Sequence, residues 1–137
     1  MTLNQIQAPP SPLDAAQPRG ILLALLPCDD AQQTVFNGGS RPLTLVSVRW
    51  VLPQSVDRLV VACAWRLQAG EHKAAVAFLD ANSNPLVQNV VSCRCDNPQL
   101  HTTLHVFERL AFPAAGDYLL AAGLDELLAG QVLIFVE

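Results

Sequence analysis

From Gly20 onward the chain consists of short apolar runs separated by turn residues, and most of these runs alternate with a period of two. The clearest run is residues 58–67, in which Arg58 and Arg66 lie on one side of the extended chain. The residues of the other side are all apolar: Leu59, Val61, Cys63, Trp65 and Leu67. Such alternation places every second side chain on one face and predicts a half-buried strand.

The remaining runs extend this pattern. Residues 73–79 place Ala74, Val76 and Phe78 inward, whereas residues 21–26 are continuously apolar, as expected of a strand covered on both faces. Turns are expected at residues 37–40, 80–85, 113–116 and 125–126. About eight strands with short connections predict an all-β, antiparallel two-sheet sandwich, either immunoglobulin-like or C2-like.

The chain carries few charges for its size. Of its 137 residues 51% are hydrophobic and 15% are charged, whereas soluble domains usually have about 25% charged residues. A subunit interface would explain this deficit, because a face buried against a partner needs no charges. The net charge of −4 argues against nucleic-acid and anionic-membrane partners, since both normally require a basic face.

The segment 1–19 differs from the rest of the chain. It holds four of the ten prolines and no sustained periodicity, so we expect a disordered or extended arm in front of a sandwich domain at residues 20–137. The segment does not have the pattern of a signal peptide, and the longest apolar run, residues 21–27, is too short to span a bilayer. We therefore predict a cytoplasmic protein with reduced cysteines.

Both ends of the expected domain carry recognisable motifs. Residues 22–48 combine an apolar strand, the group Cys28-Asp29-Asp30, a glycine turn and a second apolar strand. Residues 112–128 combine Phe-Pro, Gly116-Asp117-Tyr118 and a hairpin tip without the usual glycine. Together they resemble a family of small bacterial β-sandwich proteins of unknown function, over roughly residues 20–137. The resemblance supports the fold and implies no activity.

The cysteines are the only weak metal candidates. Cys93 and Cys95 share one face of a strand, and with Cys28 and a histidine they could compose a zinc site. However, metal sites usually begin with Cys-x₂-Cys, and free cysteine also behaves as a small buried hydrophobe. We therefore predict no metal and no cofactor. The carboxylates of Asp29 and Asp30 could bind a cation or act as an acid–base pair, but caps of a strand-end turn are the simpler interpretation.

Residues 100–110 alternate between an apolar face and a face that is neither plainly polar nor plainly apolar. One face has Leu100, Leu104, Val106 and Leu110, and the other has His101, Thr103, His105 and Phe107. His101 and His105 lie about 13 Å apart on a strand and cannot bind one ion. We expect their face, with Phe107, to point to solvent or to an interface.

Three residues have expected structural roles. Tyr118 after Gly116 fits a tyrosine corner, in which the hydroxyl bonds a nearby backbone group. Trp50 and Trp65 are expected in the core or half-buried, because each lies on the apolar side of its strand. The sequence lacks Gly-x-Ser-x-Gly and a phosphate-binding glycine loop, so we assign no catalytic residues.

The leading functional hypothesis is a non-enzymatic structural or interaction module that self-associates as a dimer. In residues 132–136 Leu133 and Phe135 point away from Val132, Ile134 and Val136, so one set needs cover outside the sandwich core. The alternatives are a sandwich that binds a small molecule or peptide at loop ends or along an edge strand, and a metal-binding protein that uses Cys28, Cys93 and Cys95.

Overall fold

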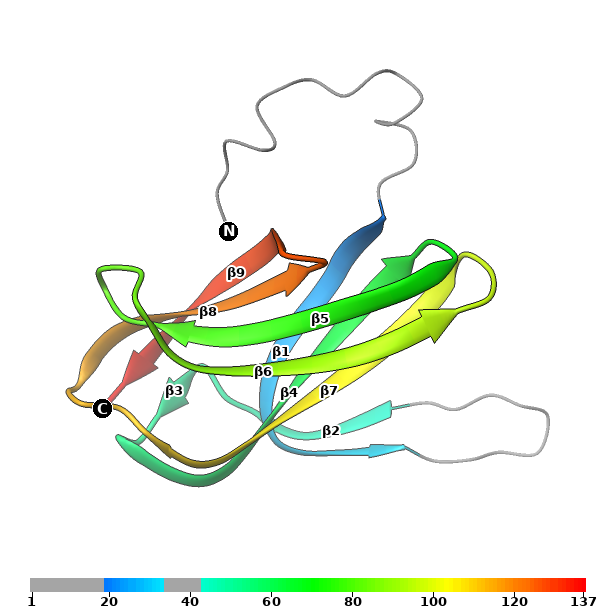
Figure 1. The fold of residues 1–137 in the computed structure, drawn as a ribbon. Helices are drawn as coiled ribbons and strands as arrows, with labels where there is room; N and C mark the ends of the chain where they lie inside the picture. The colour runs from blue at the N-terminus through cyan, green and yellow to red at the C-terminus, as the bar shows by residue number, and fades with distance from the viewer. Residues whose placement is uncertain (1–18, 34–42) are drawn as a thin grey trace.

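A computed structural model describes residues 19–33 and 43–137, which form nine strands in two sheets (Figure 1). The strands are β1 (Gly20–Gln33), β2 (Leu43–Val48), β3 (Val51–Leu52), β4 (Ser55–Leu67), β5 (Gly70–Leu79), β6 (Pro85–Cys95), β7 (Gln99–Ala111), β8 (Gly116–Leu124) and β9 (Leu127–Val136). The all-β, two-sheet prediction is confirmed. The expected turn at residues 37–40 and the expected arm, apart from Arg19, lie outside the described residues.

The two sheets have the orders β2-β1-β4-β7 and β3-β9-β8-β5-β6. All pairs are antiparallel except the short β3, which runs parallel to β9. The pairings β4–β7, β5–β8 and β8–β9 are those of strands B–E, C–F and F–G of the immunoglobulin fold. The topology is therefore immunoglobulin-like, and β6 extends the five-stranded sheet as a further edge strand.

The core lies between the sheets and contains the predicted apolar faces. All five inward residues of β4 are buried, and on β5 so are Ala74, Val76 and Phe78. The ring of Phe78 contacts Phe107 and Phe112 edge-on, with a centroid distance of 5.4 Å in each pair. These aromatic contacts join β5 to β7 and to the segment that follows it.

The expected outward face of β7 is wrong. His105 and Phe107 are 0% and 4% exposed and face the core, whereas Leu100 on the opposite side is 72% exposed. Alternation placed these residues together correctly but did not show which side was covered. Because both residues are interior, neither can contribute to the interface that we expected there.

Residues 43–52 do not form one continuous strand. β2 ends at Val48 and β3 begins at Val51, and Ser47 has a φ of 54°. Val48 and Trp50 are 42% and 44% exposed, so of the two positions expected for Trp50, in the core or half-buried, the structure excludes the core. Trp65, in contrast, is fully buried as predicted.

Two reversals fix the ends of β8. At its start the Tyr118 hydroxyl donates to the carbonyl of Ala114 at 2.7 Å, which is the bond that a tyrosine corner requires. At its end Asp125 and Glu126 have φ values of 51° and 71°. Positive φ at both central residues is the type I′ geometry that suits a two-residue hairpin and usually needs Asn-Gly. Here two acidic residues adopt it.

The described residues include no helix that is long and apolar enough to cross a membrane.

Candidate functional site

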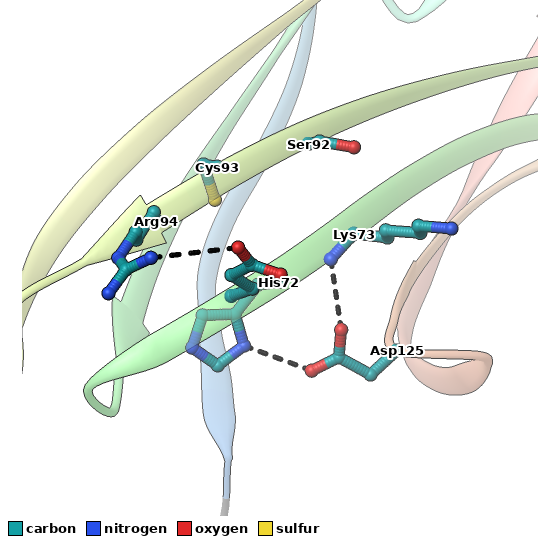
Figure 2. A pocket seen from close by; sticks show the side chains of 7 residues that line it. His72, Lys73, Ser92, Cys93, Arg94 and Asp125 are labelled. Carbon is teal, nitrogen blue, oxygen red and sulfur yellow. Dashed lines mark hydrogen bonds and ion pairs between the residues drawn. The ribbon is translucent and has the colours of Figure 1, made fainter.

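A hollow of about 530 Å³ lies where the start of β5, the end of β6 and the β8–β9 turn meet (Figure 2). Its lining residues are polar or ionisable: Glu71, His72, Lys73, Ser92, Cys93, Arg94 and Asp125. His72 and Cys93 come together because they are directly paired across β5 and β6. Neither residues 28–30 nor the 80–85 loop line this hollow.

Asp125 connects three neighbours at the edge of the hollow. Its Oδ1 accepts from the backbone N–H of Lys73 at 2.9 Å. Its Oδ2 accepts from Nε of Arg19 at 2.8 Å and lies 2.9 Å from Nδ1 of His72. Burial opposes ionisation, but the hydrogen bonds from Lys73, His72 and Arg19 hold the pKa of Asp125 below its usual value. The carboxylate is thus a structural acceptor that also fixes the strained turn.

The geometry argues against a Cys–His nucleophile in this hollow. Nδ1 of His72 faces Asp125, and Nε2 lies 2.8 Å from the carbonyl oxygen of Gln68, so neither nitrogen is free to take a proton from Cys93. Burial, together with the nearby Cys95 and Asp125, raises the pKa of the Cys93 thiol. A neutral thiol is a weak nucleophile. The arrangement stabilises the loop ends and provides no activated group.

A second polar cluster lies inside the sandwich and connects three strands. Nε1 of Trp65 donates to Oγ1 of Thr103 at 3.0 Å, and this hydroxyl lies 2.9 Å from Nε2 of His105. Nδ1 of His105 lies 3.0 Å from Oδ1 of Asn89, whose amide nitrogen donates to the carbonyl of Val106 at 3.3 Å. The chain of bonds therefore runs from β4 through β7 to β6.

The partners of His105 determine its protonation. Asn89 uses its NH₂ group on a carbonyl, so its Oδ1 must accept a proton from Nδ1 of His105. Nε2 then accepts from the Thr103 hydroxyl, which gives a neutral ring with both nitrogens satisfied. Burial lowers the pKa of His105 to about 4, so the ring is uncharged at neutral pH.

The open side of the sandwich has a second hollow. It has a volume of about 350 Å³ and lies between the edge strands β6 and β7, along residues 86–89 and 106–111. In an immunoglobulin fold a further strand often lies beside the strand equivalent to β7. In the described chain no strand pairs with this edge of β7.

The structure does not bring the weak metal candidates together. Cys28 is buried in β1, where its Sγ donates to the carbonyl of Val60 at 3.3 Å, whereas Cys93 and Cys95 lie in the other sheet. Within residues 19–33 and 43–137 no three His, Cys, Asp or Glu side chains are grouped closely enough for a metal ion. Burial raises the pKa of Cys28 and brings that of Cys63 to about 12, which favours the neutral thiol.

We expected Asp29 and Asp30 in a turn at a strand end, and this prediction is wrong. They lie within β1, where Asp29 pairs with Arg49 and Asp30 with Arg58. Asp30 also accepts from the backbone N–H of Ala31. Hydrogen bonds from the arginines lower the pKa of both carboxyl groups, so neither fits the role of a general acid.

Apolar residues gather on the outer face of the five-stranded sheet. Phe135 is paired with Val51, and their side chains are 47% and 45% exposed. Leu133 is 59% exposed and is paired with Leu119, which also faces outward. We call Val51, Leu119, Leu133 and Phe135 the β9 patch.

Sequence reasoning identified only part of these arrangements. Leu133 and Phe135 were found from the period of two, but the Arg19–Asp125–His72 network and the Asn89–His105 bond were missed. Each joins residues far apart in the chain, so no local spacing signals it.

No protein-family model and no curated protein matches this sequence. Among solved structures the chain is similar to an immunoglobulin-like protein from Pseudomonas aeruginosa. The two share 13% sequence identity with a TM-score of 0.41, and the match covers 89% of this chain and 99% of the other.

Proposed function

We propose that the protein is a non-enzymatic structural or interaction module that self-associates through the β9 patch. The observation that supports this most directly is the exposure of Leu133, Phe135 and Val51 on one sheet face, at 59%, 47% and 45%. A sheet face that is exposed to water normally carries polar residues at alternate positions. Contiguous apolar side chains on such a face are typical of an interaction site.

A second copy of the chain fits this face because two apolar patches can cover each other. Its four members are uncharged, so two patches related by a two-fold axis can pack without burying a charge among them, and the charged neighbour Asp117, which is paired with Phe135, lies at the margin. The 15% charged fraction of the whole chain agrees with burial of a face in an assembly. The cytoplasmic location expected from the sequence stays a prediction.

The test is the mass of the full chain in solution, measured by light scattering and sedimentation at micromolar concentration. We expect an assembly that Leu133→Asp weakens at least about tenfold in dissociation constant, because the carboxylate would be buried without a partner. Leu100→Asp is the matched control, since Leu100 is even more exposed, at 72%, but lies on the other sheet. A wild-type chain that is monomeric throughout would refute the proposal.

A further inference from the structure

The edges of the two sheets are not equally protected against pairing with another strand. Exposed edge strands are usually short, bulged, charged or covered, because their free N–H and C=O groups otherwise pair with another chain. The edge strand β3 has only two residues, and the edge strand β2 has six, with a φ of 54° at Ser47. β7 carries the charged residues Glu108 and Arg109, the latter with a φ of 53°, and its Val106 carbonyl is occupied by the side chain of Asn89.

β6 is a long edge strand without such a device along its middle. It has 11 residues and pairs with β5 along one side only. From Leu86 to Cys93 it carries no charge and no proline, and its outward-facing Val90 is 49% exposed. Pro85 and Arg94 flank this uncharged run but do not interrupt it. Among the edges that the described residues form, β6 is therefore the best template for an added strand.

We infer that β6 pairs with β6 of a second copy, in antiparallel orientation, and so joins two five-stranded sheets into one. An antiparallel pair of identical strands has a two-fold axis perpendicular to the sheet, which gives a closed contact. This inference deepens the proposed self-association and rests on it, but it uses an edge and not the β9 patch.

The sequence of β6 fits a two-fold axis at Val90. In that register Val90 lies opposite its own copy, Gln88 lies opposite Ser92, and Leu86 lies opposite Arg94. Apolar and polar side chains are therefore matched at the centre, and no two like charges are opposed. A strand of another protein could form the same backbone hydrogen bonds. The uncharged run of β6 would not select such a strand by charge, whereas a second copy of β6 supplies the matched side chains described above.

The two contacts together predict the size of the assembly. The β9 patch uses a two-fold axis in the plane of the interface, whereas the β6 edge uses one perpendicular to the sheet. Where these two axes cross at a right angle, the two contacts close a tetramer of D₂ symmetry, and we expect this closed arrangement. Loss of either contact should leave a dimer that is held by the other.

Sedimentation of the full chain and two variants tests this arrangement. Val90→Lys brings two like charges together at the axis, so we expect the mass to fall from four chains to two. Val106→Lys is the matched control, because Val106 is also exposed, at 38%, but lies on β7, and this variant should stay tetrameric. Thermal melts verify that each variant remains folded.

Amide hydrogen exchange gives a second readout that a face contact would not produce. On concentration of the wild-type chain, alternate amides within residues 86–93 should become protected, because edge N–H groups gain acceptors. If Val90→Lys keeps the wild-type mass and these amides gain no protection, the β6 contact is refuted while self-association through the β9 patch stands. If Leu133→Asp keeps the wild-type mass and Val90→Lys is monomeric, the patch is refuted and the β6 contact stands. A monomeric wild-type chain refutes both.

Discussion

His72 and His105 are both buried in the same sandwich, yet their surroundings differ in kind. His72 lies at one end of the fold, beside the carboxylate of Asp125 and within 3.4 Å of the guanidinium of Arg19. His105 lies deep between the sheets, where its ring nitrogens bond only to the neutral groups of Thr103 and Asn89. Burial alone therefore does not describe a histidine site, and the partners decide whether charge is accepted there.

The difference follows from the position of each histidine along its strand. His72 is near a hairpin turn, where chain ends bring charged side chains such as Asp125 and Arg19 within reach. His105 is in the middle of a long strand, and its neighbours are core residues of β4 and an edge residue of β6. A charge on His105 would be isolated in a medium of low dielectric constant.

The largest expected effect is acid destabilisation through His105. Its pKa is about 4 in the folded protein and about 6.5 in the unfolded chain, so between these values the unfolded chain binds a proton that the folded protein does not. Stability is complete above about pH 6.5, falls as the pH is lowered, and stops falling from this cause below about pH 4. The loss should be about 3 kcal/mol, measured by urea unfolding across this range.

His105→Gln provides the control for this prediction. Glutamine can bond to the same neighbours but does not titrate, so the difference in pH dependence between the two proteins isolates His105 from other titrating groups. An identical slope in both proteins would show that His105 is not the cause.

The second effect concerns the carboxylate beside His72. Asp125→Asn retains a side chain that tolerates positive φ. However, its NH₂ group would replace the oxygen that accepts from Nε of Arg19 and that lies 2.9 Å from Nδ1 of His72, so two donors would face each other at Arg19. We expect a loss of about 2 kcal/mol at pH 7, as for hydrogen bonds to charged groups. Because the pKa of Asp125 is lowered below 3.8 in the fold, the contribution of its ionised form is present above that pH and is lost below it.

Asp117→Asn is the matched control, since Asp117 is an exposed acid on β8, the strand that ends directly before Asp125. Urea unfolding at pH 7 should show the loss only for Asp125→Asn. Equal stabilities of the two variants would mean that the turn is held by its backbone alone.

The same two regions show what the sequence could and could not predict. The buried face of β4 followed from alternation, because a run such as Leu59, Val61 and Cys63 between arginines has one consistent interpretation. The orientation of β7 did not follow, because one of its faces is apolar and the other carries His101, Thr103 and His105, which predicts that the polar face is the exposed one. The β8–β9 turn was placed correctly, but its type depends on bonds from Arg19 and Lys73 to Asp125, which are distant in sequence.

A smaller effect is expected where the buried polar chain reaches β6. Asn89→Ala removes the bond to Nδ1 of His105 and exposes the edge carbonyl of Val106. One neutral hydrogen bond contributes about 1 kcal/mol, and urea unfolding at pH 7 should show a loss of that size. Gln88→Ala, at the adjacent exposed position of the same strand, should show none. An equal loss in both variants would point to the strand and not to the bond.

The smallest effect belongs to Arg19, which joins the start of β1 to the His72 region. Its guanidinium bonds Asp125 and, through Nη2, the carbonyl of Glu71 at 2.6 Å, but its side chain is 59% exposed, so solvent screens the charge. Arg19→Lys keeps the charge and loses the fork that reaches both oxygens, and we expect a loss of about 0.5 kcal/mol. Arg66→Lys, at another exposed position, should be neutral. If Arg19→Lys instead lowered the free energy of unfolding by several kcal/mol, charge pairing between Arg19 and Asp125 would dominate the stability beside His72. The two histidine sites would then differ by more than the hydrogen bonds of their rings.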